Sequence, residues 1–188
     1  MLKRILLTAA LVVGVSAPAG FAASLDFGAF ASGAQGSTVL NMGNATVTGF
    51  GSDLFVYRPG DFGEFPNWGG ICSLRGDCEH DLEIAFTGAV ENLTFQSRFH
   101  QAGDQATVFA YNGLTLLGSV LVNSDADLDF SGFGAITRLF FDDNSSAAGY
   151  GWGEFVFDEV NQVPLPASTL LLITGLAFLF TRRRVKAG

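Results

Sequence analysis

The stretch that decides the fold is 93–100, which reads Leu-Thr-Phe-Gln-Ser-Arg-Phe-His. Apolar or small side chains occupy the odd positions from Leu93 to Phe99, and polar side chains occupy the even positions from Thr94 to His100. Successive side chains of a strand point to opposite faces, so this alternation indicates a strand with one face in a core and the other in solvent. The stretch therefore predicts an antiparallel sheet that packs on one face.

The same kind of pattern fills the middle of the chain. β-Branched and aromatic residues alternate with polar ones, and Gly, Asn or Asp interrupt them about every 8 to 12 residues, a spacing typical of an all-β sandwich or barrel. The hairpin signal Asn112-Gly113 indicates a type I′ turn. The expected strands are 25–30, 38–42, 45–50, 53–57, 81–87, 91–99, 106–111, 115–122, 136–142 and 154–160, and the longest irregular stretch is 58–80.

The charges are divided unevenly along the chain. All 18 acidic residues lie between Asp26 and Glu159, and the same span holds four arginines and no lysine, which gives it a net charge of −14. Such a domain repels phosphate backbones and cannot release their counterions. Nucleic acid is therefore excluded as a partner.

The first 22 residues have the layout of a secretory signal peptide. Lys3 and Arg4 precede the apolar run Ile5–Val15, and small residues follow the run. This run is shorter than the roughly 20 residues that a permanent membrane span needs. We therefore expect export and cleavage by signal peptidase after residue 22, with 23–162 as the exported domain.

The last segment, 163–188, has three parts. A proline-rich motif, an apolar run over 168–181 and an arginine-rich tail over 182–188 follow one another. The apolar run predicts a transmembrane helix, and the positive-inside rule places the tail in the cytoplasm and the acidic domain beyond the inner membrane. The residues of the motif and the leading arginines are Val163, Pro164, Leu165, Pro166, Ala167, Arg182, Arg183 and Arg184.

These three parts, in this order, resemble the PEP-CTERM sorting signal in its VPLPA variant. The resemblance implies processing by an exosortase-like membrane transpeptidase and delivery to the cell surface or the extracellular matrix. It also implies a link to exopolysaccharide and biofilm. Leu165 stands where the namesake motif has glutamate, so the resemblance implies a dedicated sortase subtype. A plain C-terminal membrane anchor is the alternative.

The stretch from Leu93 to Val160 resembles the second half of the jelly-roll domains that occur in PEP-CTERM proteins. The features that carry this resemblance are the segments 108–113, 117–119, 136–141 and 155–160. The resemblance implies a jelly-roll-like β-sandwich of the galactose-binding-like kind. It transfers no binding residue.

Cys72 and Cys78 are the two cysteines of the chain. An even pair, six residues apart in an exported protein, predicts a disulfide that closes part of the irregular stretch. Zinc binding with His80 and a redox pair are the alternatives, although the spacing is not that of a Cys-x-x-Cys motif.

The irregular stretch is also rich in aromatic and polar side chains. Sugar rings stack on aromatic faces and bond to nearby charged groups, so Tyr57, Phe65, Trp68 and Arg75 are the candidate glycan-binding residues. The alternative is that these aromatic residues form a satellite cluster that covers one end of the sandwich.

Calcium is the cofactor that the galactose-binding-like resemblance implies, because such folds often hold a structural Ca²⁺ near the chain ends. This resemblance favours Asp26 with Asp158 or Glu159 as ligands. Solvated acidic loops are the alternative reading, since no complete EF-hand loop is present.

Catalysis has little support in the sequence. Two histidines and no Gly-x-Ser-x-Gly elbow leave no recognisable nucleophile or metal triad. We therefore expect a non-enzymatic exported protein that binds or organises exopolysaccharide, with a secreted polysaccharide hydrolase as the alternative.

Overall fold

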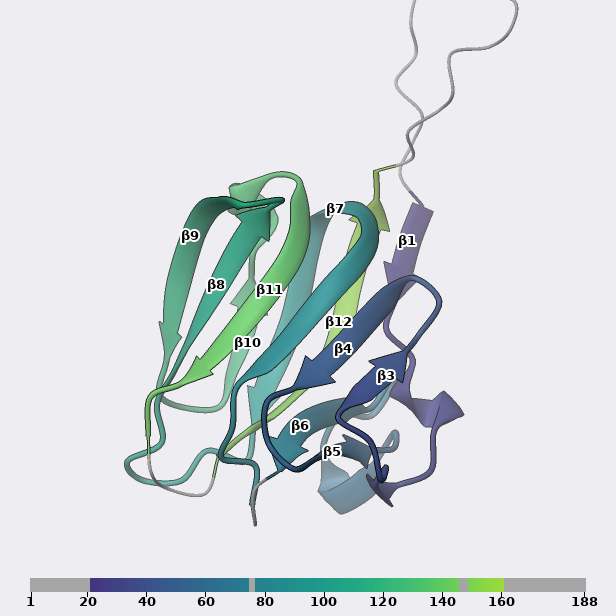
Figure 1. Ribbon diagram of the computed structural model, residues 1–188, viewed down its shortest axis with the longest axis vertical. Coiled ribbons are helices and arrows are strands. Elements are labelled where there is room, and N and C mark those ends of the chain that lie inside the picture. Colours follow the sequence, from purple (N-terminus) through teal and green to yellow (C-terminus); the bar gives the residue numbers. More distant parts are fainter. Residues whose placement is uncertain (1–20, 75–76, 146–148, 161–188) are drawn as a thin grey trace, which may run out of the picture. The chain divides into compact units, whose positions relative to one another are not determined.

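The computed structural model describes residues 21–74, 77–145 and 149–160. Within them the chain is all-β and its strands pair antiparallel, as predicted (Figure 1). The strands are β1 Phe21–Ser24, β2 Gly33–Ala34, β3 Val39–Asn41, β4 Ala45–Gly49, β5 Asp53–Tyr57, β6 Gly70–Leu74, β7 Leu82–Arg98, β8 Ala106–Asn112, β9 Thr115–Val122, β10 Ala126–Asp129, β11 Ile136–Asp143 and β12 Gly151–Glu159. Three short 3₁₀ helices, η1 Phe27–Ala29, η2 Asp61–Gly63 and η3 Ser131–Phe133, complete the described elements.

The long strand β7 organises the strand pairing. Its first half pairs with β4 on one side and β11 on the other, whereas its second half pairs with β10 and β12. One set of strands therefore runs β3-β4-β7-β11-β8-β9, and the other runs β10-β7-β12-β6-β5-β2, with β1 beside the end of β12. In the view of Figure 1, β10 and β12 lie behind β11 and β7.

The core lies where the two sets of strands face each other. Phe95 of β7 stacks on Phe155 of β12 with ring centroids 5.0 Å apart, and it meets Phe141 of β11 edge-on at 5.7 Å. Leu93, Phe95 and Ser97 are buried, while Thr94 is exposed. The observed burial of 93–97 therefore confirms the predicted inward and outward faces of the strand.

Several strand bounds differ from the sequence predictions. The expected strands 81–87 and 91–99 are one strand, β7, which continues through the exposed Gly88 at the place where its pairing with β11 shifts register between Ala85 and Val90. The expected strand 25–30 is instead the 3₁₀ helix η1, which Asp26 caps by accepting a bond from the Gly28 N–H at 2.9 Å.

The prediction that 58–80 is irregular is wrong for β6. In that prediction the glycines indicated irregular structure, but Gly70 lies in a strand. A glycine is needed at this position because a Cβ would stand 2.7 Å from the Phe65 ring and 2.8 Å from the Trp152 carbonyl oxygen. The glycine provides room for close packing and does not mark a turn.

The predicted β8–β9 hairpin is present, with a different turn. Asn112 pairs with Thr115, so the two loop residues are Gly113 and Leu114. The positive φ of 57° falls on Gly113, the first of them, and Leu114 has no positive φ. This arrangement fits a type II′ turn and not the predicted type I′ turn.

The predicted signal peptide and sorting segment lie mostly outside the described residues. Residues 1–20 are not described, nor are 161–188, which include the motif 163–167, the apolar run 168–181 and the arginines 182–184. The predicted cleavage point after residue 22 falls inside β1, whose Phe21 and Ala22 pair with Glu159 and Asp158. In the part of the chain that is described, no helix is long and apolar enough to span a membrane.

Candidate functional site

The predicted disulfide is present between Cys72 of β6 and Cys78. Their Cα atoms are 5.4 Å apart, and neither cysteine is free. The hydroxyl of Tyr57 lies 3.1 Å from the Cys78 sulfur and 3.7 Å from the Cys72 sulfur. The disulfide therefore joins β6 to the chain that follows it, and the end of β5 packs against the bond through Tyr57.

Aromatic rings pack around this bond in what we call the disulfide cluster, which is separate from the main core. Its members are Tyr57, Phe65 and Cys72, with Phe55, Leu74, Cys78 and Phe99 packed against them. Tyr57 stacks on Phe99 with ring centroids 4.9 Å apart. Burial, reinforced by the negative charge of Asp77, raises the pKa of Tyr57 to about 12.

This burial corrects the predicted glycan platform. Phe65 is fully buried and Tyr57 nearly so, which leaves neither ring face open for a sugar to stack on. For these two residues the satellite-cluster alternative is the one that the structure supports. Arg75 lies outside the described residues.

Trp68 is the predicted platform residue that stays accessible. Its side chain is 37% exposed, and its backbone is held on both sides. The Trp68 N–H donates to Oε1 of Glu154 at 2.9 Å, and the Trp68 carbonyl accepts a bond from the Phe27 N–H at 2.8 Å.

Glu154 of β12 is the anchor of this arrangement. Its carboxylate also accepts bonds from the backbone N–H and the side-chain Nδ2 of Asn67, both at 2.8 Å. Glu154 is 7% exposed and has a φ of 54°, so its backbone is strained and its charge is buried. Three hydrogen bonds from the 67–68 segment compensate for the burial of this charge.

Beside Trp68 lies a shallow groove of about 390 Å³, which we call the Trp68 groove. Asn67 and Trp68 line one part of it, and residues of β7, β10 and β12 line the rest. The strand register places Thr94 opposite Asp129 and Gln96 opposite Asp127. The lining residues are Asn67, Trp68, Thr94, Phe95, Gln96, Asp127, Leu128, Asp129, Glu154 and Val156.

The polar groups of the groove were not predicted as glycan-binding residues. The alternation in 93–100 did indicate that Thr94 and Gln96 face outward, which is the signal that could have found them. Asp127 and Asp129 come from β10, a strand absent from the prediction. Their position beside the indole depends on long-range pairing, which a single sequence does not display.

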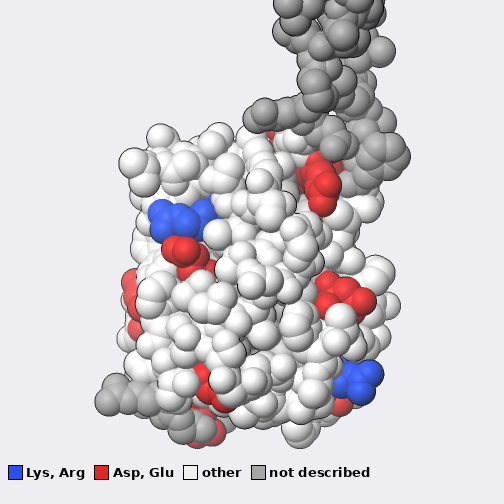
Figure 2. Space-filling view, turned by 45° about the vertical axis from the view of Figure 1, so that its right-hand side comes forward, with Lys and Arg blue, Asp and Glu red and all other residues white. Residues whose placement is uncertain are grey.

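The groove carboxylates have defined partners. Asp127 forms a 2.6 Å ion pair with Arg98, which also lies 3.3 Å from Glu64. Hydrogen bonds from the side chain and backbone of Ser131 hold the pKa of Asp129 below its ordinary value. Figure 2 shows acidic side chains at separate places on one face, with uncharged surface between them.

The structure does not gather the predicted calcium ligands. Asp26 caps η1 and lines a hollow with Arg58 and Asp61, whereas Asp158 accepts a bond from Asn92 at 2.7 Å. Over the described ranges, no group of three or more His, Cys, Asp or Glu side chains could hold a metal ion. Calcium binding therefore stays a prediction without a ligand set.

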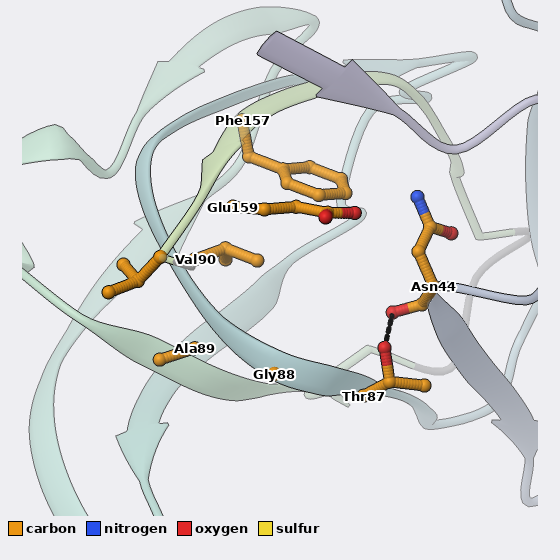
Figure 3. A pocket seen from close by; sticks show the side chains of 8 residues that line it. Asn44, Thr87, Gly88, Ala89, Val90, Phe157 and Glu159 are labelled. Atoms are coloured by element: carbon orange, nitrogen blue, oxygen red, sulfur yellow. Dashed lines mark hydrogen bonds between the residues drawn. The ribbon is translucent and has the colours of Figure 1, made fainter. Parts of the chain in front are cut away.

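Glu159, the third predicted ligand, lines a different pocket of about 350 Å³. Figure 3 shows its carboxylate and the Phe157 ring extending toward the Asn44 side of the pocket. The hydroxyl of Thr87 closes one wall by donating to the Asn44 carbonyl at 3.1 Å. Asn44, Thr87 and Glu159 supply its polar groups, and its one aromatic residue, Phe157, is buried, so the pocket offers no exposed aromatic face.

The Trp68 groove is therefore the described site that combines an exposed aromatic ring with converging polar side chains. No protein-family model matches the chain, and neither a curated protein nor a solved structure matches it.

Proposed function

We propose that this chain is an exported, non-enzymatic protein of the cell surface or extracellular matrix that binds exopolysaccharide in its Trp68 groove. The observation that carries the proposal is the exposed Trp68, whose backbone Glu154 holds beside hydroxyl, amide and carboxylate groups. The described domain is a jelly-roll-like β-sandwich in this proposal. Two sets of strands that share β7 and enclose one core support it.

The groove has the chemistry that a sugar ring requires. The C–H face of a pyranose can cover the apolar indole, while its hydroxyls bond to Thr94, Gln96 and Asp129 at the rim. Because Glu154 already holds the backbone of Trp68, little conformational freedom is lost on binding.

The charge of the domain restricts the ligand. A net charge of −14 over the acidic span repels anionic polymers. The Arg98–Asp127 pair is internally neutralised and offers no free cation for an anionic sugar. The proposed ligand is therefore a neutral polysaccharide segment. An anionic segment would need Ca²⁺ as a bridge to the acidic domain.

Asp129 suits binding better than it suits the general-acid role in hydrolysis. A glycosidase needs one carboxyl group whose pKa is raised so that it can act as a general acid. The pKa of Asp129 is lowered instead, which keeps this carboxylate ionised and suits a hydrogen-bond acceptor.

Retention of the exported protein on polysaccharide purified from its own host tests the proposal. Trp68→Ala is expected to weaken retention about tenfold, because loss of a central aromatic contact costs about 1.4 kcal/mol or more. Phe62→Ala is the matched control, since Phe62 is a more exposed aromatic residue outside the groove. Equal retention of the Trp68→Ala variant and the parent protein would show that the Trp68 groove does not bind the polysaccharide.

A reducing-sugar assay on the same samples separates binding from hydrolysis. We expect no release of sugar by the parent protein. Release that disappears in Asp129→Asn would replace the binding proposal with a hydrolase.

Sorting is the second part of the proposal and rests on the motif 163–167 with its apolar run and arginine tail. An exosortase-like enzyme would remove the tail, so the mature protein is expected to lack Arg182 and everything after it. Mass spectrometry of the exported protein measures this directly. A mature form that keeps residues 182–188 would leave a plain membrane anchor.

A further inference from the structure

The sheet edges of the described residues differ sharply in length and charge. The strands that pair on one side only are β1, β2, β3, β9 and β10. Four of them have two to four residues, and β10 carries Asp127 and Asp129. Only β9 among these described edges is long, with eight residues.

The strand β9 also lacks the usual protection of an edge. Its sequence, Thr-Leu-Leu-Gly-Ser-Val-Leu-Val, contains no charged residue and no proline. Figure 1 shows it at the end of its layer, beyond β8, which is its one strand partner among the described elements. An unpaired edge of this kind presents free N–H and C=O groups to another strand.

A register shift divides β9 into two parts. Ala110 pairs with Gly118 and Tyr111 with Leu116, so Leu117 is the extra residue of a bulge. The bulge brings Leu116 to the same outward face as Ser119 and Leu121. Both leucines are exposed, at 52% and 56%. From Gly118 to Val122 the strand is regular and open to pairing.

We propose that β9 is a self-association edge, at which Gly118–Val122 pairs antiparallel with the same segment of a second copy of this chain. Charge restricts the place at which two copies can meet. Two domains of net charge −14 repel each other, and like charges directly opposite in a ladder are destabilising. The uncharged β9 is the described long edge at which two copies meet without facing carboxylates.

The alternation of the strand fixes the register. Residues opposite each other in a ladder share a face, and a two-fold axis relates the two copies. A pairing centred on Val120 meets both conditions, because it places Ser119 opposite Leu121 of the second copy. Leu121 of each copy then packs beside Ser119 of the other copy. The sheets that end at β9 in the two copies continue into one longer sheet.

Disulfide trapping between two differently tagged full-length chains in the host tests this register. One chain carries Ser119→Cys and the other Leu121→Cys. Both positions are exposed, so we expect both chains to fold. Cys72 and Cys78 are already bonded to each other, which leaves the introduced cysteine as the free thiol. The expected product is a mixed disulfide in several-fold excess over either homodimer.

The matched control places the cysteine at Leu114 in both chains. Leu114 is 98% exposed in the hairpin turn, so it reports collisions that do not involve the strand edge. A mixed-dimer yield no greater than that of the Leu114→Cys pair would overturn the proposal. Adding Val120→Lys to the Ser119→Cys chain is expected to abolish the excess, and an undiminished excess would also overturn it. Neither outcome depends on polysaccharide binding.

Discussion

The segment between β5 and β6 places two phenylalanines in opposite environments. Phe62 and Phe65 both have a positive φ, at 55° and 47°, yet Phe62 is 75% exposed and Phe65 is fully buried. Phe65 fits against Gly70 and Gly153, where a Cβ would lie 2.5 to 2.8 Å from its ring. The contrast shows that the burial of an aromatic residue here depends on the room that Gly70 and Gly153 leave for its ring and not on local composition.

The largest expected effect is that of Phe65→Ala. The ring fills a site that the two glycines leave open, so its removal creates a cavity and is expected to lower the free energy of unfolding by about 3–5 kcal/mol. Chemical denaturation of the exported protein measures the change. A loss under about 1 kcal/mol would mean that the disulfide cluster collapses around the gap, which removes the contrast with Phe62.

Glu154→Ala is expected to have the next largest effect. It leaves three donors of the 67–68 segment without their acceptor, which costs about 2–3 kcal/mol and releases Trp68 from its position. Glu154→Gln is the matched variant, because its amide oxygen keeps one acceptor, and we expect it to lose less stability. Polysaccharide retention should fall in both variants. Retention that survives Glu154→Ala would show that the fixed indole is not what binds.

The strands were largely predictable, because burial of one face imposes a period of two on the residues themselves. This applies to β5, β8 and β9, whose bounds differ from the prediction by one residue at most. The errors occur where tertiary packing decides. Gly70 reads as a turn residue until its proximity to the Phe65 ring is known, and nothing local indicates that β10 adds to the edge of β7.

The candidate site was predictable in one residue only. Trp68 was identified because aromatic side chains away from strands are unusual, but the same reasoning also selected Tyr57 and Phe65. Glu154 gave no signal, since a buried carboxylate with a positive φ is atypical of a strand interior. Its role depends on hydrogen bonds to residues 86 and 87 positions earlier in the chain.

Removing the disulfide is expected to cost less than either change above. The bond closes a loop of six residues' separation, and the chain-entropy model gives about 2 kcal/mol for so short a loop. The double variant Cys72→Ser, Cys78→Ser should lose that much in chemical denaturation. Its polysaccharide retention should match that of the parent protein, because Glu154 holds Trp68 independently. A tenfold loss of retention would instead couple the disulfide cluster to the groove.

The smallest expected effect is that of Phe62→Ala, the exposed counterpart of Phe65→Ala. The ring touches Tyr57 and Phe99 edge-on, at centroid distances of 6.1 and 6.2 Å, and buries little surface, so the loss should stay under about 1 kcal/mol. Phe62→Gly should be the more stable of the two variants by about 1 kcal/mol, because glycine adopts a positive φ without steric cost. If Phe62→Ala instead destabilised the protein as much as Phe65→Ala, exposure would not govern the energetics of this segment, and the outer ring would belong to the cluster's core.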